Sequence, residues 1–469
     1  MYNSKQSANK RLAVGTLTYM IGNLMSKMLQ ILILPIITAA LNTEEYGYYD
    51  LLVTTISLVT PIVTFSMIEG MFRYMFDGTE ESKKKTVSTV IVFLIFGSFA
   101  LGLALAGIYF TTSYIQFPIW LYLNYISYIL FNLLQKLARC QNKNKHFAIS
   151  GVLNTGVMLA LQALSLLVLK MHVDGMLMAN CLSYCIASIY LAIHVDVKKW
   201  FSIKDANVAS FKELFSYSAP LIPNSICWWL VASSDRYIIT FFLGTAFTGI
   251  YSIAGKFSQL LTFLTSVFQL AWQESAIIEK DSRERDRFYT QTFNQYMKLL
   301  MGGYLIALPL IKILIPILLT DSFQVGYLYN PILLIGAIFS AFSQFYGSAY
   351  MVFKKTKGVL FTTVIAAIVN LLIGILLVKH IGLFAPALGT AISFFIQWLL
   401  RIYDLRDCFK VSIEIKSLIV LLVLMGLVTF IYYKMDLYVQ LFTLMTALVA
   451  FLFFNKNMIS IFIKKALKR

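Results

Sequence analysis

Residues 37–49 read ITAALNTEEYGYY, and residues 239–251 read ITFFLGTAFTGIY. The two segments align without a gap at an offset of 202 residues, counted from Ile37 to Ile239. Six of the thirteen positions are identical: Ile37/Ile239, Thr38/Thr240, Leu41/Leu243, Thr43/Thr245, Gly47/Gly249 and Tyr49/Tyr251. Chance matching in an apolar sequence is the competing explanation, but such a bias does not favour Gly, Tyr and Thr. The match therefore indicates an internal repeat.

Apolar runs long enough to cross a hydrocarbon layer of ~30 Å recur along the whole chain. They predict an all-α polytopic membrane protein with about fourteen spans, near 12–41, 48–76, 86–110, 114–137, 147–169, 173–195, 214–243, 249–278, 291–319, 325–353, 358–379, 382–404, 415–433 and 437–455. The repeat offset covers six spans, an even number, so both copies have the same orientation in the membrane. We expect an N-lobe over 1–200, a C-lobe over 201–405, and two further helices with a cytoplasmic tail over 406–469.

The chain is 59% hydrophobic and only 13% charged, against about 25% in a typical soluble domain. Its net charge of +17 reflects topology, because most of its 39 basic residues fall in loops on one side of the predicted spans. Examples of these loop groups are Lys83–Lys85, Lys354–Lys357, and Arg401 with Arg406 and Lys410. Positive loops stay in the cytoplasm, so both termini are expected there. This placement excludes a nucleic-acid partner as the reason for the charge.

Several polar side chains lie inside the predicted spans, where ionisable groups are costly and normally face an interior cavity. Ser252, Gln259, Ser266 and Gln273 recur every seven residues of the span 249–278, and Lys256 shares their face. Weaker stripes with Lys27, and with Asp235 and Arg236, mark the first two spans of each lobe. We therefore predict a water-filled cavity lined by these spans. Its excess of cations favours an anionic substrate, such as a diphosphate.

The predicted cavity residues are Lys27, Arg73, Arg236, Lys256, Gln259, Ser266, Gln273 and Lys312. Candidates for coupling to a proton or sodium gradient are Glu69, Asp235 and Glu274, although an ordinary ion pair explains each of them as well. Glu69 and Arg73 lie one helical turn apart, a spacing that allows an ion pair between them. No metal-ligand spacing or acid–base pair is found, so we expect no cofactor, no metal and no enzymatic activity.

Residues 215–277 carry four further motifs: YSAPLIPN at 217–224, SDRYII at 234–239, GIYSIAGK at 249–256 and AWQESA at 271–276. Together with TEEYGYYDLL at 43–52 and GMFRY at 70–74, this block closely resembles the bacterial oligosaccharide flippases (Wzx-like). That family is part of the multidrug/oligosaccharidyl-lipid/polysaccharide exporter (MOP) superfamily. The resemblance implies two six-helix bundles around a central cavity, as in the related multidrug transporters, with two extra helices at the C-terminus.

The resemblance also implies a function in the bacterial plasma membrane. The chain would flip an undecaprenyl-diphosphate-linked oligosaccharide to the outer face for capsule, O-antigen or exopolysaccharide assembly. Its partners would be this substrate, membrane lipids, and a polysaccharide polymerase with its chain-length machinery. A cation-coupled multidrug exporter is the first alternative, and a peptidoglycan-precursor flippase is a close neighbour. A membrane polymerase or glycosyltransferase is the alternative from another class, but the short outer loops disfavour it.

Overall fold

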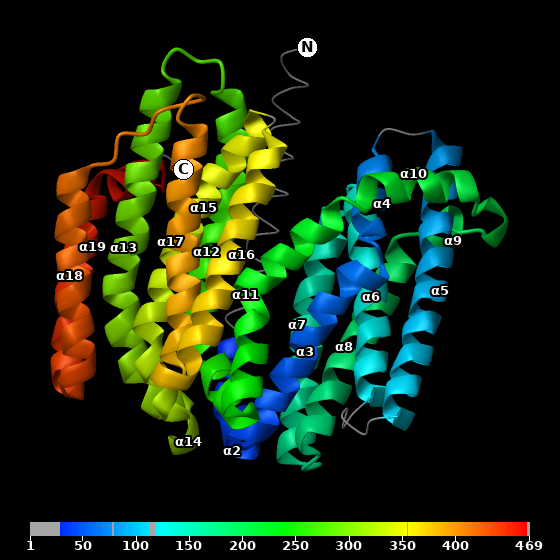
Figure 1. The fold of residues 1–469 in the computed structure, drawn as a ribbon, viewed down its shortest axis with the longest axis horizontal. Coiled ribbons are helices and arrows are strands. Elements are labelled where there is room, and N and C mark those ends of the chain that lie inside the picture. Colours follow the sequence, from blue (N-terminus) through cyan, green and yellow to red (C-terminus); the bar gives the residue numbers. More distant parts are fainter. Residues whose placement is uncertain (1–28, 77–78, 112–117, 354, 467–469) are drawn as a thin grey trace. The chain divides into compact units, whose positions relative to one another are not determined.

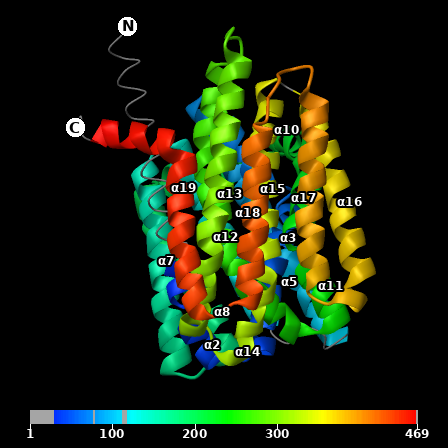
Figure 2. The same ribbon diagram turned by 90° about the vertical axis from the view of Figure 1, so that its left-hand side faces the viewer.

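The computed structural model describes residues 29–76, 79–111, 118–353 and 355–466, except for some side chains of the 245–278 helix and those near 351, 356–357 and 457–466. Throughout these residues the regular structure is helical, and no strand is found in them (Figures 1 and 2). The chain divides into two compact units, residues 1–229 and 230–469. The predicted all-α membrane fold is therefore confirmed.

Unit 1 contains long helices joined by shorter ones. They are α2 (Leu34–Ala40), α3 (Thr43–Val63), α4 (Met67–Tyr74), α5 (Glu80–Thr111), α6 (Pro118–Cys140), α7 (Asn144–Leu167), α8 (His172–His194), α9 (Val197–Trp200) and α10 (Val208–Ser218), with a short 3₁₀ turn at Ile203–Asp205. Helix α11 (Leu221–Leu243) begins in unit 1 and ends in unit 2. The Trp229 indole Nε1 donates to the Thr54 carbonyl at 3.2 Å and to Ser57 Oγ at 3.0 Å, which ties the first part of α11 to α3.

Unit 2 contains the remaining helices. They are α12 (Thr245–Ile278), α13 (Arg285–Leu318), α14 (Asp321–Gln324), the 3₁₀ helix η2 (Val325–Tyr329), α15 (Asn330–Val352), α16 (Thr356–Ile381), α17 (Phe384–Leu405), α18 (Ile415–Lys434) and α19 (Leu437–Ala466). The last two helices, which fall outside the sequence repeat, both pack against α13 (Figure 2).

In the described part of the chain, ten helices are long and apolar enough to span a membrane. The pair α3 and α4 adds an eleventh if it counts as one span, because the two are bent by 60° at a short break. The bend follows Pro61, which lacks the amide hydrogen needed for a helical bond, and contains Phe65 and Ser66 at positive φ. The predicted total of about fourteen spans, including one at 12–41 that lies mostly outside the described residues, stays a prediction.

The internal repeat has a structural counterpart in the helix starts and in the order of packing. Helices α3 and α12 begin at Thr43 and Thr245, two residues matched by the sequence offset. In unit 1, α6 and α7 pack against α8, and in unit 2, α15 and α16 pack against α17. The caps differ: Asn42 forms a capping box with Glu45, whereas Gly244 precedes α12 at φ +101°. Equivalent helices thus pack alike in the two units.

Buried side-chain hydrogen bonds join helices within each unit. In unit 1, Asn180 of α8 donates to the Tyr49 hydroxyl of α3 at 2.8 Å and accepts from Gln162 of α7 at 3.2 Å. In unit 2, the Trp272 indole of α12 donates to the Phe345 carbonyl of α15 at 2.9 Å. Because lipid is as apolar as a helix face, such bonds and close packing associate membrane helices.

The segment between α17 and α18 is held to α13 by a group of polar contacts. Asn294 donates to the Ser412 carbonyl at 2.8 Å and accepts from the Glu414 amide at 2.9 Å. Glu414 Oε2 lies 2.5 Å from Lys298 Nζ and accepts from Ser417 Oγ at 3.0 Å. The hydrogen bond from Lys298 is the main cause that lowers the pKa of Glu414 below its ordinary value of 4.5.

This anchoring should depend on pH. A carboxyl whose pKa is lowered by folding stabilises the fold above its unfolded pKa, and the stabilisation disappears as the pH falls through the folded pKa. We expect amide hydrogen exchange at residues 412–417 to accelerate below about pH 4.5 relative to the intrinsic rate. In a Glu414→Gln variant, exchange of this segment should be faster at neutral pH and should lose that pH dependence. A wild-type segment as well protected at pH 4 as at pH 7 would contradict the assignment.

Candidate functional site

A cavity of about 410 Å³ lies at the α4 end of unit 1 and contains two of the predicted site residues. Glu69, Phe72 and Arg73 of α4 form one wall together with Phe76, which lies just after that helix. The other wall is formed by Tyr217 of α10 and by Leu221, Asn224 and Ser225 of α11. Figure 1 shows α4 beside α10, and the two helices are in contact. The amphipathic helix α4 buries Met67, Ile68 and Met71 and leaves its polar side for the cavity.

Glu69 forms an ion pair that the sequence did not predict. Its Oε1 lies 2.7 Å from Nζ of Lys136, a residue of α6 that stands 67 positions later. The Lys136 ammonium and the Arg139 guanidinium also lie over the Phe72 ring, at 5.4 and 4.8 Å from its centroid. With Arg73 in the cavity wall, Glu69 and its basic neighbours carry a net positive charge, which suits an anionic ligand.

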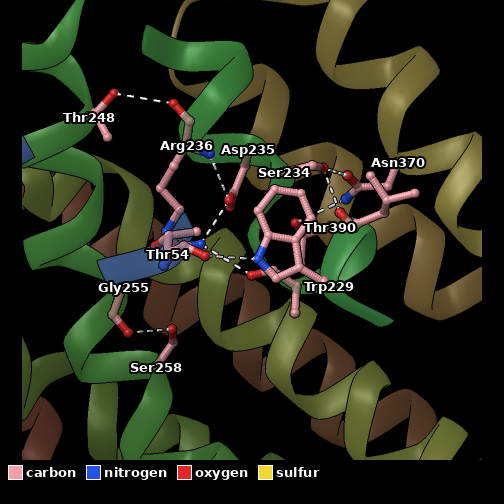
Figure 3. A network of polar contacts seen from close by, with 12 residues as sticks. Thr54, Trp229, Ser234, Asp235, Arg236, Thr248, Gly255, Ser258, Asn370 and Thr390 are labelled. Carbon is pink, nitrogen blue, oxygen red and sulfur yellow. Dashed lines mark hydrogen bonds and ion pairs between the residues drawn. The ribbon is translucent and has the colours of Figure 1, made fainter. Parts of the chain in front are cut away.

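In unit 2, Asp235 and Arg236 form a buried ion pair at the middle of α11 (Figure 3). Arg236 Nη1 lies 2.7 Å from Asp235 Oδ1, and these side chains are 11% and 7% exposed, respectively. The same carboxylate oxygen accepts from the Arg236 amide at 2.9 Å, and Nη1 also donates to the Ala232 carbonyl at 3.1 Å. Neighbouring residues of a helix normally point in different directions, so the long arginine side chain has to fold back to make this contact.

Beside this pair lies a polar layer that the sequence reasoning missed (Figure 3). Ser234 Oγ donates to Asn370 Oδ1 of α16 at 3.3 Å, and Asn370 Nδ2 donates to Thr390 Oγ1 of α17 at 3.2 Å. Ser234, Asp235 and Asn370 are all buried. Three helices therefore bring neutral oxygen and amide groups next to the Asp235 carboxylate. The lone Asn370 in the apolar helix α16 was the available signal, but it did not reveal the partners.

The predicted stripe of α12 begins next to Arg236. A Cβ at Gly255 would lie 4.0 Å from Arg236 Nη2, so the guanidinium extends along α12 next to the position of Lys256. Lys256 and Gln259 are half-buried, whereas Leu261 and Trp272 on the opposite side of the helix are buried against unit 2. The structure thus places the Arg236 guanidinium against α12, one residue before Lys256. The stripe is not uniformly accessible, because Ser252 is buried whereas Lys256 and Gln259 are half-buried.

The other predicted cavity residues are placed as follows. Gln273 is half-buried in α12, while the side chains of Ser266 and Glu274 are outside the described part of that helix. Lys27 also lies outside the described residues. Lys312 of α13 points its ammonium at two tyrosine rings, 3.6 Å from the Tyr327 centroid and 5.3 Å from that of Tyr432. The aromatic faces stabilise this cation within unit 2.

One cation assigned to a loop by the sequence is buried. Arg401 lies inside α17 and is 1% exposed, so its place among the cytoplasmic loop residues was wrong. Its Nη1 donates to the Ser343 carbonyl at 2.8 Å, and Nε and Nη2 donate to Thr362 and Thr363 at 3.3 Å each. Gly347 makes room for it, because a Cβ there would lie 2.6 Å from Nη1. Arg401 stands near the end of the predicted span 382–404 and close to Arg406 and Lys410, and for that reason it was counted with the loop residues.

Residues 12–273 match the model of a family described as polysaccharide biosynthesis protein. The match covers more than half of the 469 residues. The chain belongs to this family. No curated protein matches it in sequence.

Solved structures of the MOP superfamily share the fold. The lipid II flippase MurJ, in an inward closed conformation, is 14% identical over 97% of this chain and 99% of that chain, with a TM-score of 0.73. An inward-facing multidrug resistance MATE family transporter of the MOP superfamily is 12% identical over 84% and 98%, with a TM-score of 0.67. A MOP superfamily transporter from Pyrococcus furiosus is 12% identical over 84% and 96%, with a TM-score of 0.60. At these identities the likeness establishes the fold.

Family and fold together confirm the resemblance seen in the sequence. The chain is a multi-pass membrane protein of the polysaccharide biosynthesis family, and it has the fold of the solved flippase and transporter structures. The expected lobe boundaries at 200 and 405 and the roles of the site residues stay predictions.

Proposed function

We propose that the protein flips an undecaprenyl-diphosphate-linked oligosaccharide from the cytoplasmic to the outer face of a bacterial plasma membrane, for surface polysaccharide assembly. The observation that carries this proposal is the position of Arg236 against α12, one residue before the second cation Lys256, in a chain of the polysaccharide biosynthesis family. Cations within membrane helices are costly and normally serve a function, and binding of a diphosphate is such a function.

The cavity at α4 supports the same proposal from unit 1. It combines Arg73 with Asn224 and with the rings of Phe72 and Tyr217. A guanidinium next to amide and aromatic groups suits a phosphorylated sugar, since the cation binds the phosphate and the rings stack on the sugar face. By the distribution of basic loops this cavity is at the cytoplasmic end, where the substrate is synthesised and must enter. In this proposal both termini are cytoplasmic, and a polymerase with its chain-length machinery acts on the product.

The carboxylates Glu69 and Asp235 both carry ion pairs, which supports a structural role for each. Coupling to a proton or sodium gradient remains a proposal for Asp235 in particular, because Ser234, Asn370 and Thr390 place further oxygen atoms near it. Alternating access through a cationic cavity would need such a coupling, a membrane potential, or a partner to supply energy.

The proposal is tested by deleting the gene and measuring lipid-linked oligosaccharide in membranes together with polysaccharide at the cell surface. We expect lipid-linked units to accumulate on the cytoplasmic side while surface polysaccharide is lost. Units that accumulate on the outer side would indicate a polymerisation defect instead. Unchanged surface polysaccharide with retained cationic dyes would favour the multidrug exporter, and loss of peptidoglycan precursor export would favour a precursor flippase.

Complementation of this strain should locate the site. We expect Lys256→Ala and Arg73→Gln each to reduce surface polysaccharide by about tenfold or more at equal protein level, since a hydrogen bond to a charged group contributes about 1.5–3 kcal/mol. Lys434→Ala is the matched control, because Lys434 ends α18, outside both basic groups. Wild-type polysaccharide from both test variants would refute these assignments.

A further inference from the structure

Unit 1 contains a second and larger cavity, with a volume of about 860 Å³, formed by α5, α6 and the start of α8. Its walls carry five aromatic rings, those of Phe99, Tyr109, Phe110, Trp120 and Tyr122, and one carboxylate, that of Asp174. Volume and lining resemble small-molecule sites, which are mostly apolar cavities of roughly 300–1,000 Å³ with a few polar groups that orient the ligand. This cavity shares no lining residue with the one at α4.

The cavity is open to the region that the bilayer occupies. Phe110 is 85% exposed and Phe99 is 62% exposed, and both stand on α5, which is long and apolar enough to span a membrane. Ile119, at the start of α6, is 72% exposed. An apolar surface of this kind on a membrane-spanning helix lies in hydrocarbon. A ligand can therefore enter sideways from the lipid, and membrane lipid is the most abundant molecule there.

Among the lining residues that the structure describes, Asp174 alone is an Asp, Glu, Lys, Arg or His. It is half-buried in the first turn of α8, and no ion pair joins it to a cation within the described residues. Carboxylates are favourable near a helix N-terminus, which explains Asp174 without any ligand. That explanation leaves open why the carboxylate shares a cavity with five rings. A carboxylate next to aromatic faces is the combination that binds an alkylammonium group.

We propose that this cavity binds a phospholipid with a primary ammonium in its headgroup, with an acyl chain along the aromatic walls and the ammonium at Asp174. The cavity lies at the end of α5 opposite Lys83–Lys85, which the distribution of basic residues assigns to the outer leaflet. The proposal does not depend on which substrate the protein transports. The proposal predicts that the cavity selects lipids by their headgroup. A carboxylate that only stabilises the start of α8 would give no such selection.

Trp120 in the cavity wall provides the measurement. The full-length protein is placed in vesicles that contain either phosphatidylethanolamine or phosphatidylglycerol with brominated chains, at equal mole fractions. The contribution of Trp120 is obtained by subtracting the fluorescence quenching of the Trp120→Phe variant from that of the wild type. We expect an apparent affinity for phosphatidylethanolamine about fivefold above that for phosphatidylglycerol, as a partly desolvated cation–aromatic site with a carboxylate would give.

Two matched pairs of variants separate the parts of the site. Asp174→Asn should abolish the preference, while Asp436→Asn, an exposed aspartate that also lies at the start of a helix, should keep it. Ala106→Leu should weaken quenching by both lipids by filling the cavity, and Ala104→Leu makes the same change on the same helix outside the lining. Tryptophan emission in unbrominated lipid verifies that each variant is folded. Equal quenching by the two lipids in the wild type, or an undiminished preference in Asp174→Asn, would overturn the proposal.

Discussion

Asp235→Ala is expected to lower the free energy of unfolding by about 3–5 kcal/mol, because it leaves the buried Arg236 guanidinium without the carboxylate that lies 2.7 Å from it. The surrounding protein cannot hydrate this charge, since both side chains are nearly enclosed. The measurement is the thermal unfolding of purified protein in detergent or lipid nanodiscs. A loss of this size should appear as a clear fall in Tm and as reduced protein in the membrane.

The double variant Asp235→Ala/Arg236→Ala is the control for this effect. With both charges removed, no uncompensated ion remains, so the double variant should be more stable than Asp235→Ala alone. Polysaccharide export should nevertheless stay low in the double variant, because the proposed function needs Arg236. A double variant no more stable than the single one would show that the carboxylate does more than neutralise Arg236. Neutralisation of Arg236 would then not explain why the Asp235 carboxylate is buried.

Arg401→Ala is expected to lower the free energy of unfolding by roughly 3–5 kcal/mol. The substitution removes three hydrogen bonds from a charged group and leaves a large void in unit 2. Arg401→Lys should recover less than half of this loss, because one ammonium cannot reproduce the planar fork that reaches Ser343, Thr362 and Thr363. Thermal unfolding again provides the measurement.

The matched control is Arg406→Ala. Arg406 directly follows α17, and its side chain is 57% exposed. Its replacement by Ala should change the free energy of unfolding by no more than about 0.5 kcal/mol. Arg401→Met tests the charge itself, since it keeps most of the volume and removes the donors. If Arg401→Met were as stable as the wild type, the buried charge would contribute nothing to the fold.

Helical spans and the repeat were predictable because they depend on local properties of the chain. An apolar run of about twenty residues must be helical in lipid to satisfy its backbone, whatever its neighbours are. The matched positions Thr43 and Thr245 likewise mark equivalent helix starts, and both α3 and α12 begin there.

The partners of the charged residues were harder to predict. Glu69 and Arg73 are four residues apart, but the structure also joins Glu69 in an ion pair to Lys136 of α6, 67 positions later in the chain. Arg401 was assigned to a loop and is instead enclosed by α15, α16 and α17. Hydropathy averages over a window, so it cannot tell a charge buried near a helix end from one that has left the membrane.

Composition, apolar run length and the 202-residue offset were thus sufficient for an all-helical membrane protein built from a repeated set of helices. They sufficed because backbone hydrogen bonding in lipid is satisfied within each helix. The pairing of Glu69 with Lys136, the Ser234–Asn370–Thr390 layer and the aromatic cavity with Asp174 emerged only in three dimensions. Each unites side chains from helices distant in sequence, and helical periodicity specifies the face of a residue but not the helix that packs against it.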